Sequence, residues 1–478
     1  MRDSGGHAVV LGAGVAGLLS AAVLREHYER VTIVDRDPVP EPGQGRRGVP
    51  QGRHAHALMP RGADALDELL PGIIGCLQSA GAVTAELLPE VQLRVGGHLL
   101  RQSPIGSQMV LASRPFLESH VRDRVLAVAG IDLLAGCDVV GLAATEGAER
   151  VTGVRIVRRA AGSAEETRGA DLVVDAMGRG GRTPAWLQAL GYARPPEQQL
   201  QVGVGYASRY LRLPATAHVE KVVGVGAVPG RPRGMMLLAV EGDRRLLTLA
   251  GLTAEHRPPT DPHGFRAFAA SVAPPDVLDV ISDAEPLGEI SAYRYPSYLR
   301  RHYERLRRFP TGLLVIGDAL CSFSPVYAQG MTVAALQALA LRRCLQRGQH
   351  GLAPRYFRMA ARTVADPWRM AVHADLALPE IPGRRTPAVR MLNGYVDRVL
   401  AAAEHDELVA RQFMRVTGML DAPTRLFRPA VLGRVLRPRP VVERAYPAER
   451  STTPVATATA VAEGAPSAGR AHATDTRS

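Results

Sequence analysis

Lysine is almost absent from this sequence: one residue, Lys221, stands among 478, although the formal net charge is +12. The positive charge therefore comes almost wholly from arginines, which are spread along the chain and form no cluster interleaved with aromatic residues. Without such a cluster or a nucleic-acid-binding motif, we expect no nucleic-acid partner. A solvated surface and bound phosphate groups account for the charge more simply.

Cysteine is also scarce. Its four residues, at positions 76, 137, 321 and 344, form neither a CxxC pair nor any other metal-ligand spacing. We therefore expect a reduced, cytoplasmic protein without a disulfide framework. The pair His54 and His56 has no third ligand at helical spacing, so the sequence predicts no metal site.

Long hydrophobic runs are missing as well. The most apolar stretch, residues 9–24, carries three glycines and falls short of the ~20 residues that a membrane-spanning helix needs. The chain enters a predicted strand within about seven residues, which leaves no room for a signal peptide. The sequence therefore predicts no integral membrane segment. A Gly-x-Ser-x-Gly motif is absent too, so hydrolase chemistry has no support.

What the sequence does contain is a dinucleotide-binding fingerprint at its start. Residues 8–17 read Ala-Val-Val-Leu-Gly-Ala-Gly-Val-Ala-Gly, an apolar strand that leads through Gly12, Gly14 and Gly17 into a small-residue helix. The first glycine permits a tight turn, the second lets the backbone approach a pyrophosphate, and the third lets helix and strand pack closely. A second apolar strand, 31–34, ends at Asp35, whose carboxylate would accept hydrogen bonds from ribose hydroxyls and repel a 2′-phosphate. This order predicts bound FAD or NAD.

A second motif lies far along the chain. Residues 312–318, Gly-Leu-Leu-Val-Ile-Gly-Asp, predict a buried strand that ends at Gly317 and Asp318. A turn with proline and glycine follows, and it leads into a predicted helix over 330–345. A carboxylate at the strand end can bind the ribityl hydroxyls of a flavin, and a helix N-terminus can present backbone N–H groups to the pyrimidine end of its ring. The same residues alone would suit an ordinary buried strand and a capped helix.

Taken together, four segments resemble the single-component FAD-dependent monooxygenases with the para-hydroxybenzoate hydroxylase fold. Within them the likeness is greatest to the secondary-metabolite branch that contains polyether epoxidases and is akin to squalene epoxidase. The segments are 12–17 with Asp35; 48–56, Gly-Val-Pro-Gln-Gly-Arg-His-Ala-His; 171–182, Asp-Leu-Val-Val-Asp-Ala-Met-Gly-Arg-Gly-Gly-Arg; and 317–331. The likeness runs from residue 7 to about residue 435.

The resemblance implies a role for each matching residue. Gly12, Gly14 and Gly17 would hold the pyrophosphate of a non-covalently bound FAD, and Asp35 would hold its adenosine ribose. The other cofactor-binding residues would be Arg53 and Arg114 along the FAD, Asp318 at the ribityl chain, and Pro325, Gly330 and Met331 in a loop against the flavin ring, where Ala328 also lies. A solvated, mobile loop remains the alternative for Arg53 and His54, and an exposed arginine at a helix start remains the alternative for Arg114.

The resemblance also implies the chemistry. NAD(P)H would reduce the FAD as a transient reductant, O2 would add at the flavin C4a atom, and the hydroperoxide would epoxidise or hydroxylate a hydrophobic small molecule. A polyketide-type biosynthetic intermediate is the expected substrate class. Because the cofactor carries the difficult chemistry, the sequence assigns no catalytic side chain.

Two positions depart from the family pattern. The middle motif usually has an Asp-Gly pair linked to flavin and NADPH handling, and here it reads Met177-Gly178. The flavin loop usually reads Gly-Gln-Gly, and here it begins with Ala328. These departures keep a second hypothesis open, a non-oxidative cyclase that retains FAD as a structural scaffold. The two tryptophans are too few for the tryptophan-rich motif of flavin halogenases.

We therefore expect an α/β fold with a Rossmann-like FAD-binding domain, an inserted antiparallel-sheet substrate domain and a helical C-terminal segment. The FAD-binding domain would be discontinuous, built from 1–60, 105–190 and 295–345, and the substrate domain would comprise 61–104 and 191–294. Residues 346–446 would form the helical segment and 447–478 a disordered tail. Further expectations are a helix over 117–128, an exposed strand over 151–158, a strand over 172–174, an antiparallel sheet from 222–228, 235–240 and 246–252, and a clear helical stretch over 400–420.

Overall fold

The computed structural model describes residues 5–41 and 43–437, so the predicted tail at 447–478 lies outside the described residues. The chain opens with β1 (Gly5–Leu11), α1 (Val15–Arg25) and β2 (Tyr28–Val34), as the fingerprint predicts. The strands are short runs of Val, Leu and Ile whose side chains are almost completely buried, which is typical of a parallel sheet covered on both faces.

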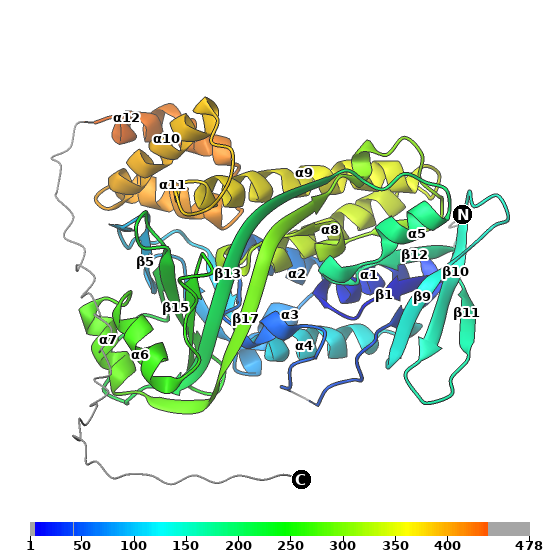
Figure 1. Ribbon diagram of the computed structural model, residues 1–478, viewed down its shortest axis with the longest axis horizontal. Coiled ribbons are helices and arrows are strands. Elements are labelled where there is room, and N and C mark those ends of the chain that lie inside the picture. Colours follow the sequence, from blue (N-terminus) through cyan, green and yellow to red (C-terminus); the bar gives the residue numbers. More distant parts are fainter. Residues whose placement is uncertain (1–4, 42, 438–478) are drawn as a thin grey trace, which may run out of the picture. The chain divides into compact units, whose positions relative to one another are not determined.

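These strands belong to a five-stranded parallel sheet in the order β18-β12-β1-β2-β8. Its other members are β8 (Ile131–Leu134), β12 (Leu172–Asp175) and β18 (Leu313–Val315). Because all five strands are parallel, their carboxyl ends meet at one edge. The loops after β1, β12 and β18, which carry the predicted motifs, therefore come together although they are far apart in sequence. Figure 1 shows β1 and β12 side by side.

Helices α4 (Arg114–Leu126) and α8 (Gly330–Leu345) both pack against α1. The helix expected over 117–128 is therefore present but begins at Arg114, where Ser113 caps it by accepting a hydrogen bond from the Phe116 backbone N–H. The helix expected over 330–345 has the predicted bounds.

The strand expected over 151–158 is β10 (Val151–Arg158), but its predicted exposure is wrong. It is the central strand of a small antiparallel sheet, between β9 (Cys137–Ala144) and β11 (Glu165–Gly169). Val151, Val154 and Ile156 are completely buried, because the apolar face of this sheet packs into the main core. The alternating pattern thus marks a strand with one buried face.

The largest sheet has eight strands in the order β19-β17-β13-β16-β15-β14-β5-β6. The apolar runs in the predicted substrate domain form β14 (Val222–Val225), β15 (Arg233–Val240) and β16 (Arg244–Gly251). The remaining strands are β5 (Val91–Val95), β6 (His98–Leu99), β13 (Glu197–Arg212), β17 (Glu285–Arg301) and β19 (Cys321–Ser322). Every pair is antiparallel except β5 and β14, which run parallel, so the sheet departs from the expected type at that one pairing.

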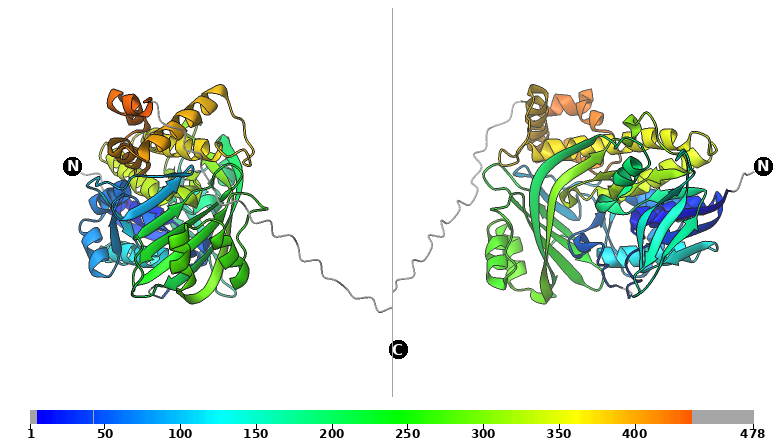
Figure 2. Two further views of the ribbon diagram at one scale, coloured as in Figure 1. Left: turned by 90° about the vertical axis from the view of Figure 1, so that its left-hand side faces the viewer. Right: turned by 45° about the vertical axis from the view of Figure 1, so that its right-hand side comes forward.

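Two short helices, α6 (Pro262–Ala270) and α7 (Pro275–Ser282), cover one face of this sheet, where Phe265 and Phe268 pack on Val223 and Leu237. The parallel sheet lies toward the opposite face (Figures 1 and 2). Between the sheets run α2 (Pro60–Leu69), α3 (Ile73–Ser79) and a three-stranded sheet of β3 (Ala57–Leu58), β7 (Gln108–Leu111) and β4 (Val83–Glu86). Helix α5 (Thr183–Ala189) follows β12.

The C-terminal segment is helical, as expected. It comprises α9 (Leu352–Asp375), α10 (Pro387–Ala403), α11 (Glu407–Thr417) and α12 (Pro429–Val435). The single stretch expected over 400–420 is wrong, because the chain leaves α10 after Ala403 and Asp406 caps a new helix. Helix α9 crosses from α8 to the large sheet (Figure 1). No helix in the described part of the chain is long and apolar enough to cross a membrane.

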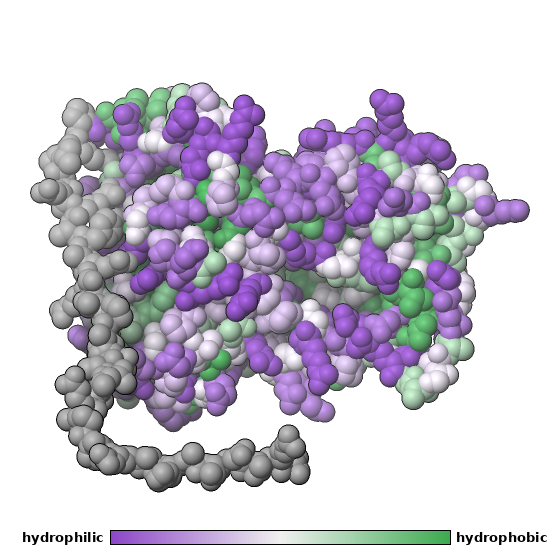
Figure 3. All heavy atoms as spheres, in the orientation of Figure 1, coloured by the Kyte–Doolittle hydropathy of each residue, from purple (hydrophilic) through white to green (hydrophobic). Residues whose placement is uncertain are grey.

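The face of the molecule in Figure 3 is mostly hydrophilic, with hydrophobic residues gathered at the upper left over α10 and α12. Met391 on α10 and Leu436, the residue after α12, have exposed apolar side chains. The division of the chain into the predicted domains stays a prediction.

Candidate functional site

The three fingerprint glycines form the tight turn between β1 and α1. Gly12 has a positive φ of 102°, and a Cβ atom there would stand 2.7 Å from the carbonyl oxygen of Ala176, after β12. A Cβ atom on Gly17 would overlap the carbonyl oxygen of Gly12. Both positions therefore require glycine, the first for its conformation and the second for close packing of helix and strand.

The N-terminus of α1 is open to an anion. Gly14 is its N-cap residue, no side chain caps the helix, and its first turn contains no acidic residue. The first backbone N–H groups of a helix lack partners within the helix and carry partial positive charge. An Arg46 Nη atom lies 3.5 Å from the point where a Gly14 Cβ would stand, and it adds a full positive charge beside this turn. The arrangement suits a pyrophosphate.

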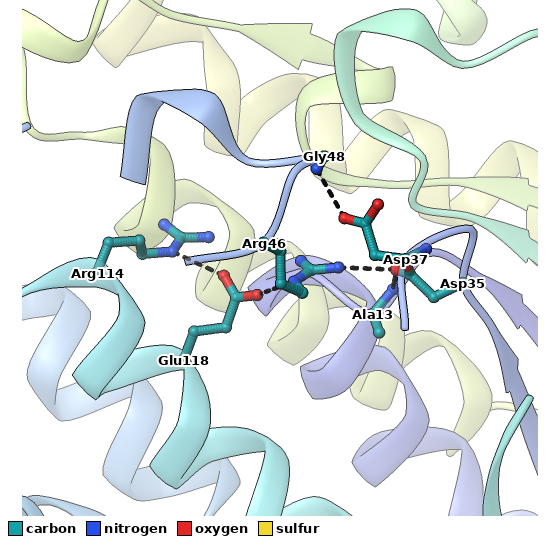
Figure 4. A network of polar contacts seen from close by, with 7 residues as sticks. All are labelled: Ala13, Asp35, Asp37, Arg46, Gly48, Arg114 and Glu118. Atoms are coloured by element: carbon teal, nitrogen blue, oxygen red, sulfur yellow. Dashed lines mark hydrogen bonds and ion pairs between the residues drawn. The ribbon is translucent and has the colours of Figure 1, made fainter. Parts of the chain in front are cut away.

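Asp35 lies directly beneath the turn, at the end of β2. One of its oxygens accepts hydrogen bonds from the Ala13 backbone N–H, at 2.5 Å, and from Arg46 Nη1, at 2.9 Å (Figure 4). The other oxygen accepts one from the Asp37 backbone N–H, at 2.8 Å. A carboxylate has about four acceptor positions. Ribose hydroxyls would therefore share Asp35 with Arg46 or displace that side chain, and the predicted ribose contact stays a prediction.

Arg46 belongs to a buried chain of charges that the sequence analysis did not identify. Its Nε atom lies 2.5 Å from Glu118, whose other oxygen is 2.9 Å from Arg114 Nε (Figure 4). Burial acts to raise the pKa of Glu118, but the guanidinium groups of Arg114 and Arg46 outweigh it and hold that pKa below its ordinary value. The signal in the sequence was the i, i+4 spacing of Arg114 and Glu118 on α4.

Arg114 begins α4, but its side chain is only 12% exposed, so the alternative of an exposed arginine at a helix start is wrong. Arg53 differs: it is exposed, and its side chain forms no hydrogen bond or ion pair with the described residues. The structure thus brings Arg114 to the motifs and leaves Arg53 outside these contacts. Their predicted contacts with FAD stay predictions.

His54, next to Arg53, is buried. Its Nδ1 atom lies 2.7 Å from the Ser208 hydroxyl on β13, and burial, aided by the charge of Arg53, lowers its pKa to about 4. The imidazole is therefore neutral at physiological pH. This bond ties the segment after Asp35 to the large sheet, which contradicts the mobile-loop alternative for His54.

The second glycine motif lies against the first. Gly317 has a φ of 67°, and a Cβ atom there would stand 2.7 Å from the Cβ atom of Ala16 on α1. The Gly317 backbone N–H donates to the side chain of Gln337 on α8, at 2.6 Å. The structure therefore brings together two motifs that are 300 positions apart, at the carboxyl edge of the parallel sheet.

Asp318, next in the chain, is half-buried and has no hydrogen-bond or ion-pair partner among the described residues. Burial raises its pKa to about 6, although the positive charges of Arg114 and Arg179 act to lower it. Partial burial of a carboxylate that accepts no hydrogen bond has an unfavourable free energy. Hydroxyl groups of a ribityl chain would supply the missing donors, so this residue fits its predicted role.

The predicted flavin loop, which we call the 324–330 loop, joins β19 to α8. Pro325 begins a short 3-10 turn, and Ala328 adopts the left-handed conformation with φ 51°. Gly330 begins α8, whose N-terminus has no side-chain cap. Among the described residues the buried Gln329 Oε1 atom has no hydrogen-bond partner, and Met331 is buried. The buried Thr332 Oγ1 atom lies against Gly62 of α2. Free N–H groups and an unpartnered polar atom fit the polar edge of a flavin ring.

Ala328 of this loop belongs to a wider hydrophobic cluster. Ala328 packs in a cluster with residues of the large sheet and of the C-terminal helices. The partly buried members of that cluster are Ala55, Val83, Leu93, Val95, Tyr210, Met236, Ala328, Met370, Tyr395, Val396 and Leu408. A hydrophobic ligand would find apolar surface here without polar competition.

Comparisons with known proteins agree with this architecture. The chain is 35% identical over 442 residues to protein Rv3254 of Mycobacterium tuberculosis, a match that covers 90% of this chain and 93% of the relative. It is 27% identical over 423 residues to kynurenine 3-monooxygenase of Salinispora tropica, covering 84% of each. No profile of a known protein family matches it.

Among solved structures, the flavoprotein/dehydrogenase of Cytophaga hutchinsonii has a TM-score of 0.64 at 13% identity, covering 90% of this chain and 96% of the other. Further structures with this fold include flavin-dependent halogenases and FAD-dependent monooxygenases. The predicted fold class is therefore confirmed, and the predicted enzyme class, an FAD-dependent oxidoreductase, agrees with these proteins.

Proposed function

Since the chain belongs to the same family as protein Rv3254, whose name states no activity, we propose its function from the site: an FAD-dependent monooxygenase that acts on a hydrophobic small molecule. One observation carries this proposal. The open N-terminus of α1 and the unpartnered carboxylate of Asp318 lie at one edge of the parallel sheet, in the order that a long dinucleotide would need for its pyrophosphate and its ribityl chain.

The residues divide the cofactor between them. The turn at Gly12 and Gly14, with Arg46 beside it, would hold the pyrophosphate, and Asp318 would accept hydrogen bonds from the ribityl hydroxyls. The 324–330 loop would present the N-terminus of α8 to the flavin ring, where positive partial charge favours the electron-rich reduced form. When bound and reduced by NAD(P)H, FAD supplies the activation of O2 that the side chains of this chain do not provide.

The substrate would bind between the 324–330 loop, the large sheet and the C-terminal helices. These three parts of the chain contribute partly buried apolar side chains to one hydrophobic cluster, which suits a hydrophobic substrate. They would orient the substrate and exclude water, and no charged side chain is needed for insertion of oxygen into a carbon–carbon double bond or an aromatic ring. We infer epoxidation or hydroxylation of a polyketide-type intermediate, the reaction of the epoxidase-like branch that the motifs resemble.

Two relatives support oxygenation. One is named a kynurenine 3-monooxygenase, and one structural neighbour is a p-nitrophenol 4-monooxygenase from Pseudomonas putida. Halogenases share the fold, but the chain has two tryptophans, too few for the tryptophan-rich halogenase motif. One observation favours the rival function, a non-oxidative cyclase that keeps FAD as a scaffold. Ala328 holds a strained φ of 51° where the family has glycine, and its methyl group could crowd the face that O2 approaches.

Isotope labelling separates the two functions. Candidate polyenes and aromatic polyketides are incubated with the FAD-loaded protein, NADPH and 18O-labelled O2, and the products are analysed by mass spectrometry. An oxygenase gives a product that gains one labelled oxygen atom and consumes NADPH in step with it. A product of unchanged mass, formed anaerobically without a reductant, would overturn the proposal in favour of the cyclase.

A further inference from the structure

A carboxylate occupies a core position of the long helix α9. The buried face of this helix is otherwise apolar over its second half, with Val364, Trp368 and Ala371 at helical spacing, and the next position on that stripe is Asp375. Asp375 is 2% exposed. It is also the last residue of the helix, where the helix dipole disfavours a negative charge. Nothing in the packing of α9 requires an acid here.

The polar contact of Asp375 is with the 324–330 loop. Its Oδ1 atom accepts a hydrogen bond from the Tyr327 hydroxyl, at 2.6 Å. The buried hydroxyl of Tyr298, on β17, faces the same carboxylate and acts with Tyr327 to lower its pKa. No ion pair involves Asp375 in the part of the chain that the structure describes. The hydrogen bond from Tyr327 thus links the 324–330 loop to the end of α9.

The bond is placed where the loop is strained. Tyr327 immediately precedes Ala328, whose left-handed backbone is unfavourable for a residue with a Cβ atom. Such conformations persist only where the surroundings fix them. Tyr327 is held by α9 on one side of the strained residue, and α8 begins at Gly330 on the other.

We propose that Asp375 is a positioning residue for the flavin, which holds Tyr327 and thereby keeps the 324–330 loop in the conformation that contacts the ring. This inference rests on the proposed binding of FAD at that loop. It assigns a functional role to a C-terminal helix that carries no part of either glycine motif.

The proposal has a pH dependence with a definite sign. An ionised carboxylate accepts a stronger hydrogen bond than its protonated form does. Burial raises the pKa of Asp375 to about 6, while the hydroxyls of Tyr327 and Tyr298 act to lower it. The groups that face it are hydroxyls: Tyr327 from the loop, Tyr298 from β17 and, further away, Tyr206 from β13. The hold on the loop is therefore complete above pH 7 and weakens as the pH falls through about 6.

Two variants and one control test this role. Asp375→Asn keeps the size of the side chain and removes its charge, and Tyr327→Phe removes the hydroxyl. Asp366→Asn is the control, because it removes an exposed carboxylate of the same helix that pairs with Arg369. Hydrogen exchange of peptides that cover 324–330 is measured first in FAD-free protein. The visible spectrum and the dissociation constant of added FAD are then recorded between pH 5 and 8.

At pH 7.5 we expect faster exchange over 324–330, an altered visible spectrum of bound FAD and roughly tenfold weaker binding in Tyr327→Phe, with a smaller change in Asp375→Asn. The wild-type spectrum should approach that of Asp375→Asn as the pH falls below 6, and Asp366→Asn should match wild type throughout. Wild-type exchange and spectra in both variants would overturn the inference. A protein that takes up no FAD would instead refute the proposed function, while the exchange measurement would still decide whether Asp375 positions the loop.

Discussion

Replacement of Asp318 by alanine is the perturbation whose size follows most directly from the structure. Among the described residues the carboxylate has no donor and is half-buried, so its hydrogen bonds to FAD would be charge-assisted and partly shielded from water. Such bonds contribute about 1.5–3 kcal/mol, which corresponds to roughly 10- to 150-fold weaker binding. No other single carboxylate should matter as much. Asp35→Ala should come second, because Asp35 already shares its oxygens with three protein donors.

The assay is a fluorescence titration of FAD-free protein with FAD. Asp132→Ala is a suitable control, since Asp132 is an exposed carboxylate on β8 of the same sheet. The titration also has a pH signature. With a pKa raised to about 6 by burial, Asp318 is ionised at pH 8 and increasingly protonated below 6, where it becomes a poorer acceptor. Affinity should therefore fall with decreasing pH in wild type and lose part of this dependence in Asp318→Asn. Wild-type affinity in Asp318→Ala would refute the role assigned to the residue.

Three further changes have expected signs. Ala328→Gly should stabilise the protein by up to about 1 kcal/mol in urea denaturation, because it relieves the strain of a positive φ. Coupling of NAD(P)H consumption to product formation should be similar or better. A destabilised variant would show that packing of the Ala328 methyl group outweighs the backbone strain. Arg46→Ala should lower the free energy of unfolding by about 3–5 kcal/mol in urea denaturation, because it leaves the buried carboxylates of Asp35 and Glu118 without their shared partner. A decrease below about 1 kcal/mol would show that this buried chain of charges is dispensable for stability. The pKa of Asp375 is higher in the folded state than its ordinary value of 3.8, so its contribution to stability is full below pH 4 and is lost as the pH rises through about 6. The effect of Asp375→Asn on the free energy of unfolding should therefore be more stabilising at pH 8 than at pH 4, by about 1–3 kcal/mol. An equal effect at both pH values would contradict the raised pKa of Asp375.

The parts of the fold that the sequence predicts are those with local causes. The fingerprint turn needs glycine for a positive φ at Gly12 and for contact at Gly17, and both requirements act within a few residues. The bounds of α8 and of the strand before Asp318 were also predictable, because a short apolar run next to glycine or proline sets them within a few residues. Their meeting was only implied, by the resemblance that assigns both motifs to one FAD, and the structure explains it because parallel strands end at one edge of the sheet.

The parts that the sequence did not predict depend on distant contacts. The exposure of β10 was wrong because its buried face is set by packing against the main core, which a run of alternating residues does not reveal. Arg46 and Glu118 meet across 72 positions, and Tyr327 and Asp375 across 48. A signal for Asp375 was present, a carboxylate on an apolar helical stripe, but only the partner in the loop gives it a meaning.

The central claim is that this chain binds FAD at the joined glycine motifs and uses it as a redox cofactor. The most direct measurement is the absorption spectrum of the purified protein, first as isolated and after addition of FAD, then anaerobically with NADPH, and finally with O2 readmitted. We predict one non-covalently bound FAD per chain, released by heat, that is bleached by NADPH and regains its colour with O2. A colourless protein that takes up no added FAD would contradict the account, and a bound FAD that NADPH never reduces, with or without candidate substrates, would contradict the monooxygenase.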